Sequence, residues 1–140
     1  VLAKQEAKQC GYDEAILLNI NGAVSEGPGE NIFLVKNGII YTPPKSDNAL
    51  DGITGNSIKI IAENNGIEVK ETSLIRDQLF TADELFFTGT AAEVTPIREI
   101  DGRHIGSGKR GPITEKLQTQ FFNIVAGKDE KYKNWLTYTR

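Results

Sequence analysis

The stretch Asn31-Ile-Phe-Leu-Val-Lys-Asn-Gly-Ile-Ile-Tyr-Thr42 decides the fold of this chain. Two apolar runs, 31–35 and 39–42, flank the dipeptide Asn37-Gly38. Asn-Gly supplies the positive φ angles that a tight type I′ turn requires. The stretch therefore predicts an antiparallel hairpin, and Pro43-Pro44 is expected to end its second strand, because proline cannot donate to a ladder of hydrogen bonds.

Outward from this hairpin, the pattern alternates between helical and strand-like segments. Helices are predicted at residues 2–9, 53–65, 75–81 and 112–126, and further strands at 14–20 (buried), 67–72, 85–87 and 93–100. Gly66 and Gly127 are the stop signals of two helices, and Pro112 suits a first helical turn. The sequence shows no internal repeat and no linker. It predicts one mixed α/β domain over residues 1–140, with the tail docked through Trp135.

Composition and charge exclude several classes of protein. The 140 residues are 39% hydrophobic and 25% charged, which is ordinary for a globular domain and not for a disordered or fibrous one. The net charge is −3, from 16 basic and 19 acidic side chains, so no basic surface points to nucleic acid. No apolar run is long enough for a membrane span. Neither nucleic acid nor a membrane is expected as a partner.

Single residues add further expectations. The chain contains no methionine, so Val1 is not a translation start and a longer protein is expected. Its one cysteine, Cys10, excludes an internal disulfide, favours a reducing, cytoplasmic location, and is expected in the core or half-buried. The only histidine, His104, is expected on a surface strand, so no Ser-His-Asp set or metal site is predicted.

Glu26-Gly-Pro-Gly-Glu30 is the first loop that could carry chemistry. Its glycines and proline force an irregular approach to the strand that follows. In one interpretation it is a turn with two solvated acids. In the other, Glu26 points into a site from the end of a strand.

Leu50-Asp-Gly-Ile-Thr54-Gly55 is the second loop, and it comes where a helix should begin. Free backbone N–H groups at a helix start, with glycines that allow close approach, form a natural phosphate site. Capping of the helix by Asp51 is the simpler alternative. The segment is not a P-loop, because the Gly-Lys-Ser/Thr ending is missing.

Thr88-Gly-Thr90-Ala91-Ala92 is the third loop, directly after an apolar strand. Its small residues allow backbone N–H groups and hydroxyls to meet an anion. A plain glycine-containing loop is the alternative interpretation.

Together, in order and spacing, the loops resemble the class IV aminotransferases, and among them the branched-chain amino acid aminotransferases. The resemblance rests on Glu26-x4-Asn31-Ile-Phe33, Ile40-Tyr-Thr-Pro-Pro44, Leu50-Asp-Gly-Ile-Thr54 and Phe87-Thr-Gly-Thr-Ala-Ala-Glu-Val-Thr-Pro-Ile97, and it covers essentially the whole chain. It implies the larger, C-terminal domain of fold type IV, with a mixed sheet that forms a partial barrel and flanking helices.

The resemblance also implies the cofactor pyridoxal 5′-phosphate and the residues that hold it. The residues placed on the cofactor are Glu26 at the pyridine nitrogen, Leu50 on the ring, and Ile53, Thr54 and Thr90 at the phosphate. Thr90 and Ala91 match the loop that meets the substrate carboxylate. Two positions depart from the family pattern: Pro28 replaces a small residue, and Gly55 replaces a basic one.

The implied reaction transfers the amino group of leucine, isoleucine or valine to 2-oxoglutarate, in a homo-oligomer of the full-length protein. The family's Schiff-base lysine is expected upstream of Val1, as is a smaller N-terminal domain. No catalytic residue is therefore expected in this chain, and the chain alone is expected to be inactive. The alternatives are another enzyme of the same fold (D-amino acid aminotransferase or aminodeoxychorismate lyase) and a catalytically dead binding module.

Overall fold

The structure is a computed structural model that describes residues 2–10, 16–18, 21–26, 30–44, 52–89 and 93–128. The helices are α1 Leu2–Gln9, α2 Ile53–Asn64, α3 Arg76–Phe80 and α4 Pro112–Val125. The strands are β1 Leu17–Leu18, β2 Val24–Glu26, β3 Asn31–Lys36, β4 Ile39–Thr42, β5 Val69–Glu71, β6 Glu84–Gly89, β7 Glu93–Pro96, β8 Glu99–Ile100 and β9 Arg103–His104.

A five-stranded mixed sheet in the order β5-β4-β3-β6-β7 organises the described residues. The pair β4–β5 is parallel, and the other neighbouring pairs are antiparallel. The predicted hairpin is confirmed as β3 and β4, with φ of 52° at Asn37 and 77° at Gly38. Positive φ at both central residues is the type I′ geometry that Asn-Gly favours. The mixed α/β class is confirmed.

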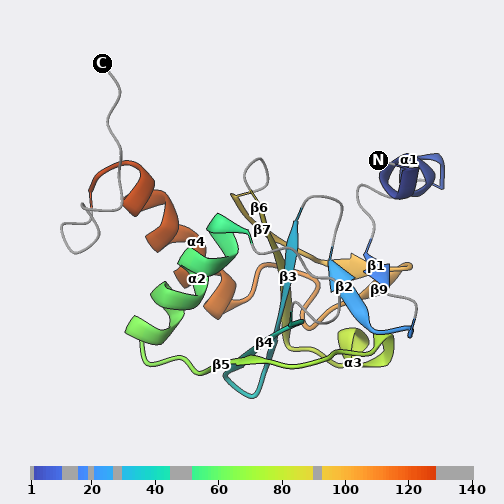
Figure 1. The fold of residues 1–140 in the computed structure, drawn as a ribbon, viewed down its shortest axis with the longest axis horizontal. Coiled ribbons are helices and arrows are strands. Elements are labelled where there is room, and N and C mark those ends of the chain that lie inside the picture. The colour runs from blue at the N-terminus through green and yellow to red at the C-terminus, as the bar shows by residue number, and fades with distance from the viewer. Residues whose placement is uncertain are drawn as a thin grey trace.

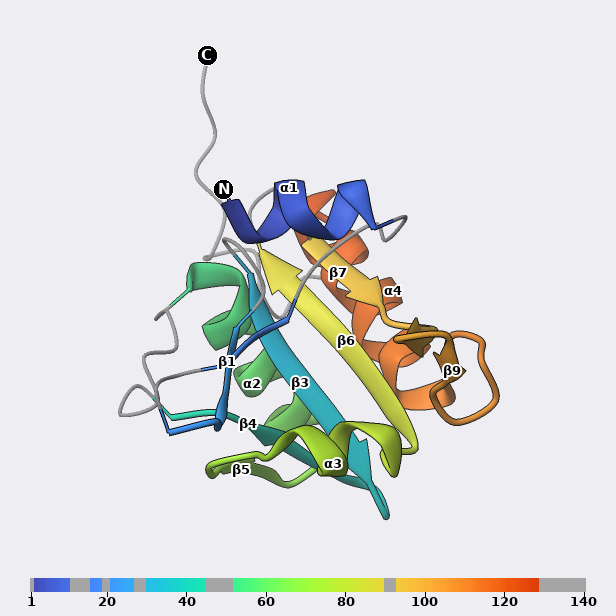
Figure 2. The same cartoon turned by 90° about the vertical axis from the view of Figure 1, so that its right-hand side faces the viewer.

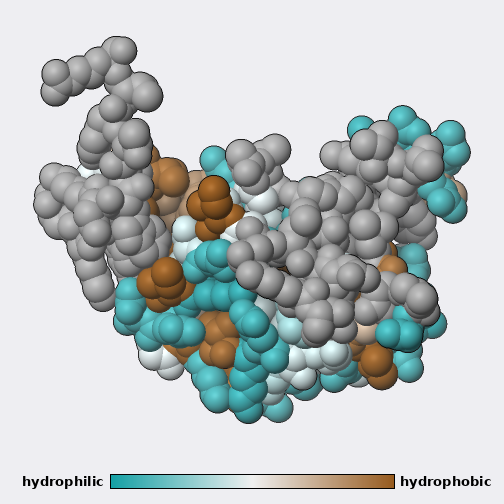
Figure 3. Space-filling view, in the orientation of Figure 1, coloured by the Kyte–Doolittle hydropathy of each residue, from teal (hydrophilic) through white to brown (hydrophobic). Residues whose placement is uncertain are grey.

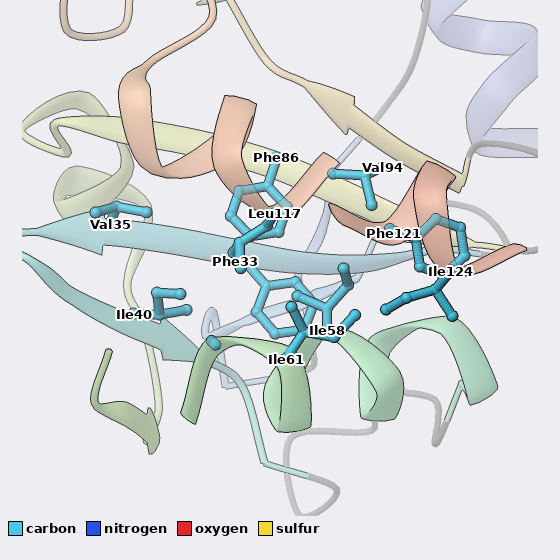
Figure 4. Close-up of a cluster of buried hydrophobic side chains, with 11 residues drawn as sticks. Phe33, Val35, Ile40, Ile58, Ile61, Phe86, Val94, Leu117, Phe121 and Ile124 are labelled. Carbon is cyan, nitrogen blue, oxygen red and sulfur yellow. The ribbon is translucent and has the colours of Figure 1, made fainter. Parts of the chain in front are cut away.

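One face of this sheet is covered by α2 and α4, which lie on the same side of β3 in Figure 1. Figure 4 shows the side chains that fill the space between them, with Phe33 of β3 and Phe86 of β6 above the apolar residues of α2. The two phenyl rings stack, with centroids 5.1 Å apart and an interplanar angle of 7°. Burial of these apolar side chains is the main favourable contribution to folding.

The opposite face of the sheet carries a second core, because residues alternate between the two faces of a strand. Ile32 and Leu34 of β3 point to this side and pack with Leu74, Leu79 and Ile105. Figure 2 shows α3 crossing this face near one end of β3 and β6. The central strands β3 and β6 are therefore buried on both sides, and this fixes the register between them.

The predicted start and stop signals of the helices α2 and α4 are confirmed. α2 ends at Asn64, and Gly66 follows with φ of 75°. α4 begins at Pro112 and is followed by Gly127 with φ of 74°. These positive φ values are the left-handed conformation in which helices commonly stop and which glycine adopts without strain.

Three expectations about strands and burial are wrong. Residues 93–100 are not one strand: β7 ends at Pro96, and the chain turns into the separate β8–β9 hairpin around Asp101-Gly102. Pro96 has no N–H to donate to the ladder, and the N–H of Ile97 still bonds to the carbonyl of Leu85, the next residue in the β6–β7 register, before the chain enters the hairpin. Within the predicted buried strand 14–20, the structure describes residues 16–18, of which Leu17–Leu18 form β1, and Leu18 is 47% exposed rather than buried.

Cys10 is also exposed, against expectation. It follows the polar helix α1, in which Gln5, Glu6 and Gln9 are exposed too, so no apolar surface draws it inward. His104 is exposed on β9 as predicted. Trp135 and the tail beyond residue 128 lie outside the described residues.

Within the described residues, no helix is long and apolar enough to cross a membrane. On the face displayed in Figure 3, the hydrophobic areas are small and separated by hydrophilic surface. The large apolar residues that remain exposed are Leu18, Ile53, Ile60, Ile75, Phe122 and Val125.

Candidate functional site

The ends of three segments that are far apart in sequence meet at one end of the sheet. β3 begins at Asn31, β6 ends at Gly89, and Asn31 lies opposite Thr88 in the antiparallel register. The first turn of α2 packs against these two side chains through Gly52 and Gly55. The structure thus places the start of α2, which follows the second predicted loop, beside Asn31 and Thr88. Asn31 follows the first predicted loop, and Thr88 opens the third.

The N-terminus of α2 has no side-chain cap. The N-cap residue is Gly52, with extended backbone (φ −77°, ψ 141°), and no acidic side chain lies in the first turn. The first intrahelical bond joins the N–H of Asn56 to the carbonyl of Gly52, 3.0 Å apart. The N–H groups of Ile53, Thr54 and Gly55 therefore have no acceptor within the helix. With the helix dipole, they make this end attractive to an anion.

The glycines at this helix start permit close packing against the sheet. A Cβ on Gly52 would overlap Oδ1 of Asn31, and a Cβ on Gly55 would lie 2.9 Å from the same oxygen and 3.2 Å from Oγ1 of Thr88. Both glycines thus let the helix backbone lie close to these two side chains of the sheet.

Thr88 brings an unpartnered polar atom to this place. Its side chain is 0% exposed, and its hydroxyl has no hydrogen-bond partner within the structure. A buried hydroxyl without a partner is costly, by about 1–3 kcal/mol. Together with the uncapped α2 N-terminus, it fits a site that a phosphate group would complete.

Two of the predicted site residues stand at this end of α2. Ile53 and Thr54 are its first two residues, and Ile53 is 86% exposed although it is apolar. Glu26 is the last residue of β2, where it pairs with Leu17. Leu50, Thr90 and Ala91 lie outside the described residues, as does Asp51. Gly52 holds the N-cap position of this helix, and the alternative of capping by Asp51 stays a prediction.

The sequence interpretation misses Asn31 and Thr88 as members of this site. It places Asn31 in the hairpin strand and in a motif of the resemblance, and Thr88 in a loop whose hydroxyls can meet an anion, but it gives neither residue a role of its own. The available signal is the polar residue at each strand end, directly beside a glycine-rich segment. Their meeting depends on the β3–β6 register, which no local pattern reports.

Comparison with known families decides the relationship. The family model described as amino-transferase class IV matches residues 1–100. The chain belongs to the class IV aminotransferases. Within the described residues, no group of three or more His, Cys, Asp or Glu side chains could hold a metal ion.

Two relatives of this chain are named as branched-chain-amino-acid aminotransferases. The chain is 53% identical to the branched-chain-amino-acid aminotransferase of Pseudomonas aeruginosa over 140 residues, which are 100% of the chain and 45% of that relative. It is 56% identical over 137 residues to a probable enzyme of the same name from Aquifex aeolicus, covering 97% of the chain and 44% of the relative. The chain thus spans less than half the length of these relatives.

Solved structures agree with this membership of class IV. The T.th. branched-chain amino acid aminotransferase, complexed with N-(5′-phosphopyridoxyl)-L-glutamate, aligns with a TM-score of 0.95 at 48% identity, over 98% of this chain and 46% of that one. The branched-chain aminotransferase of Thermoproteus uzoniensis with norvaline aligns with a TM-score of 0.93 at 53% identity, over 97% and 45%. The fold type IV expectation is confirmed.

Proposed function

We propose that this chain is the C-terminal, cofactor-binding part of a branched-chain amino acid aminotransferase. The full-length protein transfers the amino group of leucine, isoleucine or valine to 2-oxoglutarate with pyridoxal 5′-phosphate. The observation that carries the proposal is the uncapped N-terminus of α2, with Thr54 in its first turn and the unpartnered hydroxyl of Thr88 beside it. Relatives above 50% identity with this name support the substrate class.

The residues of this chain have distinct tasks in that reaction. The N–H groups of Ile53 and Thr54 hold the phosphate, and the Thr54 hydroxyl adds a hydrogen bond. Leu50 packs on the ring, Glu26 faces the pyridine nitrogen, and Thr90 makes a second phosphate contact. Thr90 and Ala91 receive the substrate carboxylate. Pyridoxal phosphate, when bound, supplies the electron sink for loss of the α-proton.

The remaining parts of the activity belong to the full-length protein. The lysine that carries the cofactor and a smaller N-terminal domain lie upstream of Val1, and the full-length protein is a cytoplasmic homo-oligomer. The C-terminal placement is supported by the coverage, since this chain aligns with about 45% of each relative's length.

Substrate profiling of the full-length protein tests the proposal. Glutamate formation from 2-oxoglutarate is measured with L-leucine, L-isoleucine, L-valine and D-alanine as amino donors. We expect the three L-amino acids to be used and D-alanine to be inert. Preference for D-alanine would indicate a D-amino acid aminotransferase instead. No transfer from any donor, despite bound cofactor, would indicate a binding module.

A further inference from the structure

The polar pair Asn31 and Thr88 lies at the end of a row of paired side chains on one face of the sheet. On the α2 side of the sheet, the stacked pair Phe33 and Phe86 lies one step before it, since residues two apart share a face. An apolar pair at the end of this row would extend the core at no desolvation cost. Two polar side chains here therefore require an explanation other than packing.

Asn31 supports the first turn of α2. Its Oδ1 occupies the space that a Cβ on Gly52 would need, and it lies 2.9 Å from the Cβ position of Gly55. Gly52 is the N-cap residue, so this contact sets how the free N–H groups that follow it are oriented. Asn31 thus supports the position of the helix start from the neighbouring strand, through its side chain.

Thr88 has a counterpart in the same chain that has no anion site beside it. Thr114, also 0% exposed, has a hydroxyl without a partner and stands in the first turn of α4. There, the carboxylate of Glu84 already accepts hydrogen bonds from the N–H groups of Ile113 and Thr114. The N-cap residue of α2, Gly52, has no side chain that could make such a bond. The hydroxyl of Thr88 therefore lies beside a helix start that has no acidic side chain in its first turn.

We propose that Asn31 and Thr88 are positioning residues of the phosphate site, and that together they set its affinity for a phosphate group. Asn31 holds the first turn of α2 through Gly52, and the hydroxyl of Thr88 gains its hydrogen bond when the site is filled. The proposal rests on the proposed function, because it assigns the α2 N-terminus to the phosphate of the cofactor.

The test compares two ligands that differ only in phosphate. Pyridoxamine 5′-phosphate and pyridoxamine are titrated into the cofactor-free full-length protein, with ligand fluorescence as the readout. We expect Thr88→Val and Asn31→Ala each to weaken pyridoxamine 5′-phosphate binding about fivefold, the value of roughly one hydrogen bond, and to leave pyridoxamine binding unchanged. Asn31→Asp keeps the size of the side chain and adds a negative charge. Its loss of affinity for pyridoxamine 5′-phosphate should therefore be larger, and this loss should decrease as the salt concentration rises.

Matched controls separate this role from a structural one. Thr114→Val removes an equally buried, unpartnered hydroxyl, and Asn123→Ala removes an exposed asparagine side chain of α4. Neither should change binding of either ligand. In urea, Thr88→Val should be as stable as the unchanged protein or more stable, because it removes an unsatisfied group. Wild-type affinity in Thr88→Val and Asn31→Ala would overturn the proposal.

Two outcomes distinguish this inference from the proposed function. If the unchanged protein binds the phosphorylated ligand no more tightly than pyridoxamine, the proposed function fails. If the unchanged protein binds the phosphorylated ligand more tightly than pyridoxamine, and the variants bind it as tightly as the unchanged protein does, only the inference fails.

A double-mutant cycle tests the contact with Gly52 directly. The Cβ of Gly52→Ala overlaps Oδ1 of Asn31, so this variant should weaken phosphate-dependent binding when Asn31 is present. In the Asn31→Ala background the space is vacated, and Gly52→Ala should then cause no further loss. An equal loss in both backgrounds would show that Asn31 does not hold this turn.

Discussion

The carboxylate of Glu84 accepts a hydrogen bond from the backbone N–H of Thr114, with 2.8 Å between Oε1 and the nitrogen. Its other oxygen lies 3.2 Å from the nitrogen of Ile113. A Cβ on Gly111, the N-cap residue of α4, would overlap this carboxylate. The N-terminus of α4 is thus satisfied by an anion from the chain's own β6, whereas the first turn of α2 has no acidic side chain and its N-cap is a glycine.

Removing this internal anion should destabilise the fold. Glu84→Ala leaves the N–H groups of Ile113 and Thr114 without their acceptor, and hydrogen bonds to a charged group contribute about 1.5–3 kcal/mol. We expect the free energy of unfolding in urea to fall by about 2–3 kcal/mol. Glu84→Gln keeps one acceptor oxygen and should lose about 1 kcal/mol.

The control for this change is Glu63→Ala, which truncates an exposed glutamate of α2. It should change stability by less than about 0.5 kcal/mol, as surface substitutions usually do. Equal stability of Glu84→Ala and the unchanged protein would contradict the role given to this carboxylate.

Thr54→Ala should weaken the cofactor site and spare the fold. The hydroxyl lies in the first turn of α2, and its loss removes one hydrogen bond to the phosphate, about 1 kcal/mol or roughly fivefold in affinity. Titration of the full-length protein with pyridoxamine 5′-phosphate measures this. Thr119→Ala makes the same change on the exposed side of α4 and should bind normally. Normal affinity of Thr54→Ala would remove Thr54 from the phosphate site.

Local signals make the elements around the site predictable. Asn37-Gly38 marks its turn within two residues, and Gly66 and Pro112 mark helix ends through their own backbone preferences. The start of α2 is predictable because Gly52 and Thr54 stand where an apolar helical pattern begins. Each of these inferences needs only a short window of sequence.

The part of the candidate site that Asn31 and Thr88 form could not be predicted in this way. The pairing of Asn31 with Thr88 joins strands that are distant in sequence, and it is fixed by the two cores that β3 and β6 share. The β8–β9 hairpin that follows Pro96 likewise depends on distant contacts, since Ile100 and Ile105 pack on the second core. Tertiary contacts decide both features, and a local sequence pattern does not indicate such contacts.

Phe86→Ala should be among the most damaging single changes in the core. Phe86 is 0% exposed and stacks on Phe33 between the sheet and the two covering helices. Truncation of a buried phenylalanine costs about 3–5 kcal/mol, because a cavity replaces the ring. Thermal and urea unfolding should both register the loss. Phe122→Ala is the matched control: this ring is 41% exposed on α4, and its loss should cost about 1 kcal/mol or less.

Glu26→Gln should lower turnover of the full-length enzyme much more than it lowers stability. A carboxylate beside the pyridine nitrogen stabilises its protonated form, which the neutral amide cannot do. We expect kcat to fall by more than about tenfold, equivalent to about 1.4 kcal/mol of activation free energy. Glu63→Gln, on the exposed side of α2, should retain full turnover. If Glu26→Gln also retains it, Glu26 is not the partner of the pyridine nitrogen.

Three described lysines of this chain, Lys36, Lys59 and Lys70, are unlike the amine that carries the cofactor. The amine of Lys36 donates to the carbonyl of Thr81 at 2.8 Å, and that of Lys59 lies 2.7 Å from Oε1 of Glu71. The side chains of Lys36 and Lys70 are 42% and 50% exposed. A nucleophilic lysine instead needs a desolvated place over one face of the cofactor, where burial lowers its pKa.

We therefore expect the 140-residue chain, without any added sequence, to transfer no amino group from leucine to 2-oxoglutarate. Incubation with pyridoxal phosphate, reduction with borohydride and peptide mass mapping should show scattered labelling well below one group per chain, because a free aldehyde reacts slowly with any exposed amine. Full-length protein treated in the same way should carry one label on a single lysine upstream of Val1. Stoichiometric labelling of one lysine in the short chain, together with turnover, would show that it contains its own catalytic amine and that the assignment of its site residues is wrong.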